Sequence, residues 1–196
     1  NLTMRGTVIR GNHFHDIGPT ITAKDGFVDV MAVYLDDCFC GTTIVSNVFE
    51  RAGRAMMIGG GRDNVVANNL FLDCNPAMHV DARGIGWASF WFDGRDPFLM
   101  EGLKEVPYDR PPYATRYPHL AGILQDEPAK AKYNRLLNNV VIGKGKPIDW
   151  LDGLSEATVE TGGNTFVKTP AEVRFDPVHR RVQAAGFQPI AFDRIG

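Results

Sequence analysis

A motif centred on an asparagine recurs along the chain and constrains its fold more than any other feature. Each copy reads apolar-x-x-Asn-x-apolar within a short run rich in β-branched residues. The copies are VIRGNHF (8–14), TIVSNVF (43–49), VVANNLF (65–71), RLLNNVV (135–141) and, more loosely, TGGNTF (161–166). The asparagines are Asn12, Asn47, Asn69, Asn139 and Asn164, at spacings of 35, 22, 70 and 25 residues. Spacings of 22 and 25 are typical of single solenoid turns, and the longer ones indicate turns that carry insertions.

A second apolar run follows the inner motifs at a fixed offset of eight residues. These runs are AMMIGGG (55–61), AMHVDAR (77–83) and PIDWLDG (147–153), and AVYLDDC (32–38) is the equivalent after Asn12, displaced by twelve residues. Two strands of about five residues per coil, without a helical period, predict a parallel β-helix. We therefore expect an all-β fold, a short right-handed parallel β-helix of about five to six coils. The asparagines are interpreted as a scaffold ladder at one corner.

The whole chain, 1–196, is expected to form one domain with two departures from the repeat. Residues 84–133 form a long inserted loop with a short helical stretch around His119–Gln125, and 170–196 form a closing tail. Because the repeat begins at Thr7 without a cap, we expect a piece of a longer protein, or a homo-oligomer formed through the uncapped N-terminal coil.

Charge and composition exclude several classes of function. There are 21 basic and 23 acidic residues without a block of like charge, which disfavours nucleic-acid binding. No apolar run is long enough to span a bilayer, so no membrane association is predicted, and the chain shows no signal peptide. The three cysteines lack a CxxC pair and are interpreted as small buried thiols.

The second strands separate an inward face from an outward face. The apolar sets Val33–Met56–Met78–Ile148 and Leu35–Ile58–Val80–Trp150 should point inward. The outward sets are Tyr34–Met57–His79–Asp149 and Asp36–Gly59–Asp81–Leu151.

Asp36 and Asp81 share an outward column two coils apart, roughly 9.6 Å along the axis at about 4.8 Å per coil. Gly59 leaves the floor between them bare. This arrangement resembles the acid and base of an inverting glycosidase, whose carboxyl groups lie about 6.5–9.5 Å apart. Asp37 competes with Asp36 for the same role, and the alternative is that these side chains are only solvated.

His79 and Arg83 lie beside Asp81. Arg83 could orient a sugar hydroxyl, neutralise a uronate carboxylate in a lyase, or simply form a structural salt bridge with Asp81 or Asp63. In a lyase the carboxylates would be candidate calcium ligands; for a hydrolase no cofactor and no metal is expected.

The insertion contributes aromatic side chains. Trp87, closest to the expected cleft, is a candidate stacking platform for a sugar ring, whereas Trp91 and Phe92 are expected to belong to a small core within the loop. Tyr34, in the outward column, and Arg62, in GGGRDN, are further candidate substrate-binding residues.

Three stretches, 33–88, 104–142 and 186–196, resemble secreted bacterial right-handed parallel β-helix proteins and are similar to glycoside hydrolase family 141. Its members are described as α-L-fucosidases and xylanases. The motifs LDD and HVDARG are the most specific, and the resemblance implies carboxylates at Asp36 or Asp37 and at Asp81. It also implies a secreted or periplasmic parent protein with further N-terminal coils.

Together these features predict a carbohydrate-active enzyme, an inverting glycoside hydrolase acting on a polysaccharide or oligosaccharide. The alternatives are a polysaccharide lyase and a non-catalytic carbohydrate-binding or oligomeric β-helix.

Overall fold

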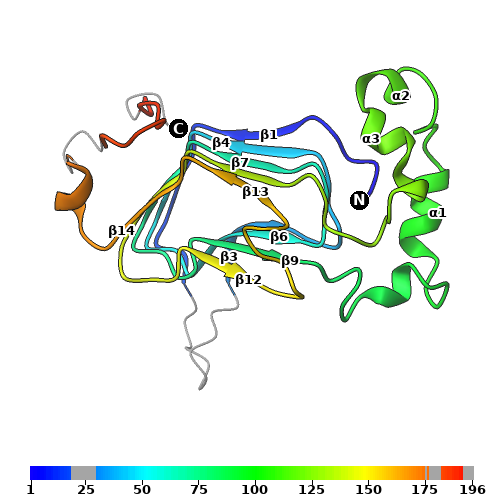
Figure 1. Ribbon diagram of the computed structural model, residues 1–196, viewed down its shortest axis with the longest axis horizontal. Coiled ribbons are helices and arrows are strands. Elements are labelled where there is room, and N and C mark those ends of the chain that lie inside the picture. Colours follow the sequence, from blue (N-terminus) through cyan, green and yellow to red (C-terminus); the bar gives the residue numbers. More distant parts are fainter. Residues whose placement is uncertain (19–29, 175, 177–181, 192–196) are drawn as a thin grey trace.

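The computed structural model describes residues 1–18, 30–174, 176 and 182–191. Within them the chain forms three sheets in which every pairing is parallel, and successive strands pass from one sheet to the next (Figure 1). This is the solenoid arrangement expected from the repeat. Three parts of the sequence prediction lie outside the described residues. They are most of the insertion that displaces AVYLDDC, residues 175 and 177–181 of the expected closing tail, and residues 192–196, which belong to the ending that carries the family resemblance.

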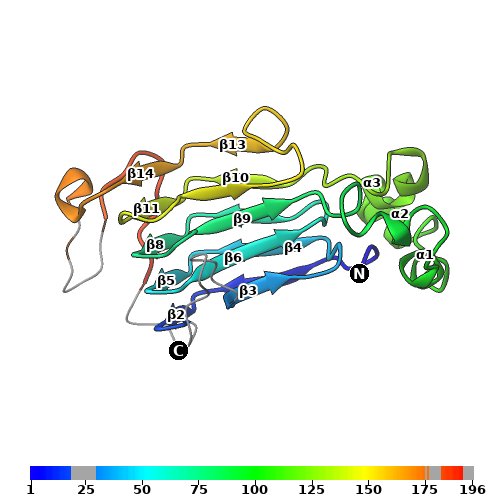
Figure 2. The same ribbon diagram turned by 90° about the horizontal axis from the view of Figure 1, so that it is seen from below.

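The three sheets are here called sheets A, B and C. Sheet A contains β1 (Thr7–Arg10), β4 (Thr42–Val45), β7 (Val65–Ala67), β10 (Arg135–Leu137) and β13 (Glu160–Gly162). Sheet B contains β2 (His13–His15), β5 (Val48–Glu50), β8 (Leu70–Leu72), β11 (Val140–Ile142) and β14 (Thr165–Val167). Sheet C contains β3 (Met31–Leu35), β6 (Arg54–Gly59), β9 (Met78–Asp81) and β12 (Ile148–Trp150). Figure 2 shows the strands of sheet C stacked one above another.

The asparagine ladder forms as predicted, at the corner between sheets A and B. The side-chain oxygen of Asn69 accepts from the backbone and side-chain nitrogens of Asn47, both at 3.0 Å, and the same pattern joins the other pairs. The residue before each asparagine has a positive φ, which turns the corner: Gly11, Ser46, Asn68, Asn138 and Gly163. A second ladder, which the sequence analysis missed, passes from Thr42 through Asn64 to Asn134 at the corner between sheets C and A.

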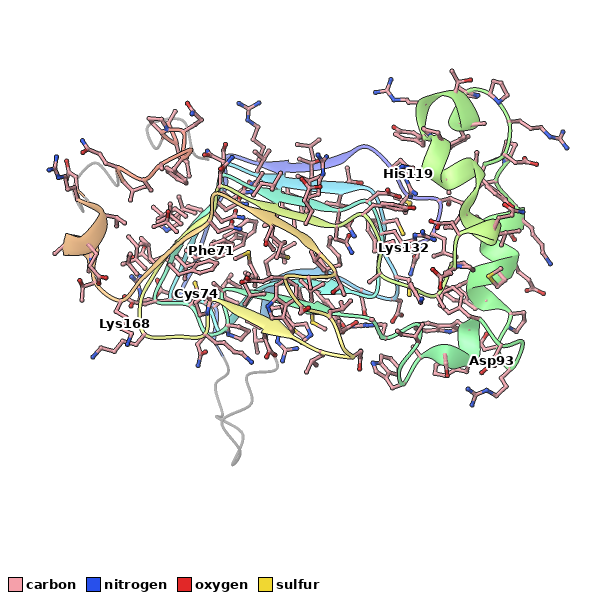
Figure 3. All side chains as sticks on the ribbon, viewed as in Figure 1. Phe71, Cys74, Asp93, His119, Lys132 and Lys168 are labelled. Carbon is pink, nitrogen blue, oxygen red and sulfur yellow. The ribbon has the colours of Figure 1, made fainter. Side chains whose placement is uncertain are left out.

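The predicted inward faces are confirmed, since the side chains of all three sheets meet in one buried core. Phe14, Phe49 and Phe71 stack along sheet B with ring centroids 4.9 and 4.8 Å apart. Figure 3 shows Phe71 between the sheets. Trp150 is only partly buried but packs against the same core.

The insertion leaves the corner after β9 and contains five short helices. Its apolar side chains, Trp91 among them, form a buried cluster that also includes Leu2, Cys38 and Cys40 from outside the insertion. Its elements are η1 (Ser89–Trp91), α1 (Phe98–Lys104), α2 (Tyr113–Arg116), α3 (Pro118–Ala121) and η2 (Ile123–Gln125). The helical stretch expected near His119–Gln125 corresponds to α3 and η2. The helix α1 was not predicted, and it packs through Leu99 and Leu103 into the core of the insertion.

The described part of the tail covers the outer face of sheet B. That face is apolar, with Val48, Leu70 and Val140 buried against Val182 and Phe187 of the tail. The backbone of Gln188 bonds in both directions to the Asn68 side chain, at 2.6 and 3.0 Å. Before it, η3 (Pro170–Val173) adds Val173 to the same cluster.

Candidate functional site

Arg83, just after β9, is the centre of the predicted site. Its side chain is only 2% exposed. The guanidinium binds Asp81 through Nε to Oδ1 at 3.0 Å and Nη2 to Oδ2 at 2.8 Å. Its Nη1 donates to Asp36 at 2.5 Å and to the Tyr34 hydroxyl at 3.0 Å. One buried cation therefore joins three of the residues that the sequence singled out.

Gly59 explains why the guanidinium can occupy this position. A methyl group added at Gly59 would overlap the guanidinium, and one added at Gly60 would overlap the Arg83 stem. The bare floor predicted between Asp36 and Asp81 therefore exists, but it accommodates Arg83 rather than an attacking water. This corrects the expectation of an open floor, and the structural salt bridge with Asp81 foreseen as an alternative is present.

Asp36 and Asp37 are the accessible carboxylates of the cluster, with side chains 49% and 35% exposed. Burial acts to raise the pKa of Asp36, but hydrogen bonds from Tyr34 and from the Asp37 backbone, together with the Arg83 charge, lower it overall. The pKa of Asp37 is raised, first by burial and then by the neighbouring Asp36 charge. Two adjacent carboxyl groups thus have pKa values shifted in opposite directions.

Asp81 differs from both because its side chain is 5% exposed and Arg83 binds both of its oxygens. Burial opposes ionisation, but the nearby His79 ring, together with the hydrogen bonds and charge of Arg83, lowers the pKa of Asp81 to about 2. A general acid needs the opposite shift. The geometry therefore favours Asp81 as a permanently charged counter-ion of Arg83.

His79 lies between Asp81 and Asp149 on the outward face of sheet C. Its Nδ1 lies 3.0 Å from Asp149, and its Nε2 lies 3.5 Å from Asp81. Lys146 pairs with Asp149 on the far side. Asp149 was predicted in the same outward column as His79 but was given no role. That shared column could have indicated that the two side chains interact.

Aromatic rings flank the cluster on two sides. The Arg83 guanidinium carbon lies 5.5 Å from the Tyr34 ring centroid and 5.4 Å from that of Trp87. Trp87 is 63% exposed, whereas Trp91 is buried, which agrees with the positions expected for the two rings. Trp87 therefore presents an exposed aromatic surface beside Arg83.

Arg62 does not join this cluster. It is buried on the other side of the corner, where it pairs with Asp126 and lies over the Tyr133 ring at 5.5 Å. The structure thus brings together seven of the eight predicted site residues and separates Arg62 from them, so it gives Arg62 a structural role in docking the insertion.

Three further features of the described residues concern metal ligands, cysteines and membrane-spanning helices. Across residues 1–18 and 30–174 there is no group of three or more metal-ligating side chains placed to hold an ion. The cysteines are free and buried, and burial raises the pKa of Cys38 to about 12 and that of Cys74 to about 11. Of the helices described, none is long and apolar enough to cross a membrane.

Comparisons with known proteins give no match: no family model, curated protein or solved structure is similar to this chain at a significant level. The resemblance to glycoside hydrolase family 141 accordingly stays a prediction from the motifs.

Proposed function

We propose that the protein is a carbohydrate-active enzyme, a glycoside hydrolase acting where sheet C meets the insertion. The observation that carries the proposal is the adjacent pair Asp36 and Asp37. Both are accessible, and their environments shift the two pKa values apart. Such a separation is how an enzyme keeps one carboxyl group protonated as an acid and another ionised as a base or nucleophile.

The proposed roles follow from these environments. Asp37 gives its proton to the glycosidic oxygen as the bond from that oxygen to the sugar carbon breaks. Asp36 and Asp37 lie 2.5 and 3.6 Å from the same Arg83 nitrogen, so they are closer together than an inverting pair, and the spacing favours a retaining mechanism. The ionised Asp36 forms a bond to the sugar carbon as the leaving group departs. Water then displaces Asp36 from that carbon, and Asp37 takes the water proton. Arg83 keeps Asp36 ionised, Asp81 and His79 keep Arg83 in position, and Trp87 and Tyr34 contact the sugar.

A polysaccharide lyase, with its calcium requirement, fits the site less well. A lyase would use the cation to neutralise a uronate carboxylate, but Arg83 is buried and already bonded to Asp81, Asp36 and Tyr34. Retention at the sugar carbon, in place of the inversion expected from the sequence, completes the proposal, together with right-handed winding, about five to six coils and a secreted parent protein.

The test is a screen of the purified chain on plant and algal polysaccharides and aryl glycosides. New reducing ends, without the ultraviolet absorbance of an unsaturated uronate, support the hydrolase. Asp37→Asn should then abolish turnover on natural polysaccharides. Nuclear magnetic resonance of the first anomer released distinguishes retention from inversion. Ultraviolet-absorbing products would indicate the lyase instead.

The matched control for Asp37→Asn is Asp93→Asn. Asp93 lies in the insertion, and its side chain binds the side chain and backbone of Arg95. The activity of this variant should equal that of the wild type. Binding of a polysaccharide with no turnover by the wild type would contradict the hydrolase and leave a carbohydrate-binding β-helix.

A further inference from the structure

A groove runs between the outer face of sheet A and the helices of the insertion, on the opposite side of the corner from Arg83. It consists of two adjoining cavities of about 390 and 420 Å³ that share Asp63, His119 and Arg135. Each lies within the range of about 300–1,000 Å³ typical of small-ligand sites. Figure 3 shows His119 where the insertion approaches the sheets.

The floor of the groove is one outward column of sheet A. Thr43, Val65, Arg135 and Glu160 follow one another in register across β4, β7, β10 and β13. The groove therefore crosses the strands and follows the direction in which the coils stack, a shape that suits an extended chain. Its wall is Arg116 to His119, at the junction of α2 and α3.

Asp63, the carboxylate closest to the corner, is already paired with side chains of the protein. Asp63 binds Nη2 of Arg5 at 2.7 Å and Nδ1 of His119 at 3.1 Å, and the His119 ring stacks on Tyr133 with centroids 4.1 Å apart. The Asp63 side chain is largely buried by these contacts. Its charge is balanced within the protein and leaves the groove without a strongly repulsive anion at this end.

Two arginines, by contrast, face the groove without a carboxylate partner in the described residues. Arg135 is exposed on the floor, and its cross-strand neighbour Glu160 does not approach to ion-pairing distance. Arg116 on the wall bonds only to the Tyr117 hydroxyl, at 3.1 Å. With Arg5, three arginines line the groove against two carboxylates, in a chain whose net charge is -2.

We propose that this groove binds an acidic polysaccharide segment, with Arg116 and Arg135 recognising its carboxylate or sulfate groups. Guanidinium groups pair with both through charge-assisted hydrogen bonds. The sugar part of this inference rests on the proposed function, whereas the acidic character of the ligand follows from the arginines. The groove would hold a stretch of the substrate distant from the bond cleaved near Asp36 and Asp37.

Binding is measured by calorimetric titration with three polysaccharides of matched length: polygalacturonate, a sulfated galactan and a neutral galactan. We expect one or both acidic polymers to bind, with the neutral one at least tenfold weaker. The acidic polymer that binds more tightly identifies the group recognised. Arg135→Ala and Arg116→Ala should each weaken binding about two- to fivefold, as expected for partly exposed ion pairs.

The matched control is Arg10→Ala, because Arg10 is an exposed arginine at the end of β1 in the same sheet and does not line the groove. Equal binding of the neutral polymer, no change in the Arg135 and Arg116 variants, or an equal loss with Arg10→Ala would each overturn the proposal. Duplex DNA bound as tightly as the acidic polysaccharides would do so too, by indicating a general polyanion surface.

Asp37→Asn separates this inference from the hydrolase. The variant should lose turnover but keep its affinity for the acidic polymer, because Asp37 lies on the other side of the corner. Groove-dependent binding without turnover in the wild type would contradict only the hydrolase, and turnover without groove-dependent binding would contradict only the groove.

Discussion

Replacing Arg83 with methionine should destabilise the protein mainly through Asp81, the residue it leaves behind. Methionine retains much of the apolar stem but removes the guanidinium, so a carboxylate with a 5% exposed side chain loses both of its charge-assisted hydrogen bonds. Removing one member of a buried ion pair costs about 3–5 kcal/mol. We therefore expect Arg83→Met to lower the free energy of unfolding at pH 7 by about 3 kcal/mol.

The lowered pKa of Asp81 gives an independent estimate of how strongly His79 and Arg83 together stabilise its charge. It falls from 3.8 to about 2, which corresponds to a stabilisation on the order of 2 kcal/mol at neutral pH. Because the folded-state pKa lies below the unfolded one, this stabilisation is complete above about pH 4 and is lost as the pH falls towards 2. Without Arg83, burial should raise the pKa of Asp81, so the penalty in the variant is relieved as the pH falls.

The assay is urea denaturation of the wild type, Arg83→Met, Asp81→Asn and the double variant at pH 7 and at lower pH. The double variant should lose about 2 kcal/mol less than the sum of the single variants at pH 7. Arg95→Met, which removes an exposed ion pair, should leave stability nearly unchanged. Additive losses, or a coupling that does not decrease on acidification, would refute the assignment of Asp81 as the counter-ion of Arg83.

Three further predictions concern the scaffold and the position of Arg83. Asn69→Ala should lower the free energy of unfolding by about 2–4 kcal/mol, because it leaves buried polar groups on both neighbouring coils unpaired. Asn12→Ala, at the partly exposed end of the ladder, should lower it clearly less in the same urea assay. Gly59→Ala should expel the Arg83 guanidinium and, in the proposed enzyme, reduce turnover at least tenfold with secondary structure retained by circular dichroism; wild-type turnover would refute the fit. Phe71→Ala should cost about 3–5 kcal/mol, and a thermal midpoint equal to that of the wild type would contradict the stacked core.

The scaffold could be predicted because its signals are local and repeated. The asparagine spacing sets the corner, and the alternation within each strand sets which residues are buried, so Met56 and Met78 are both correctly assigned to the interior. The second ladder was missed because its first member is Thr42, so only Asn64 and Asn134 carry the asparagine that would mark a repeat.

The site could be predicted only as a set of neighbours. The spacing of the strands predicts that Asp36, Gly59 and Asp81 are neighbours in one column. It does not predict that the Arg83 side chain folds back over Gly59 and fills the space there. In that position the Arg83 charge and hydrogen bonds, with His79, lower the pKa of Asp81 and therefore set its role. The groove on sheet A was not predicted because its wall comes from the insertion, whose docking leaves no periodic trace in the sequence.

The asparagine ladder also has a consequence for how the chain folds. Most of its steps join residues 22 to 35 positions apart, so coils can form by adding one turn to the next. The step from Asn69 to Asn139 must instead close a segment of 70 residues. Closing 70 rather than 22 residues adds about 1 kcal/mol of chain entropy. We expect the coils on either side to form first and to join when the insertion collapses, which makes that junction the slow step of folding.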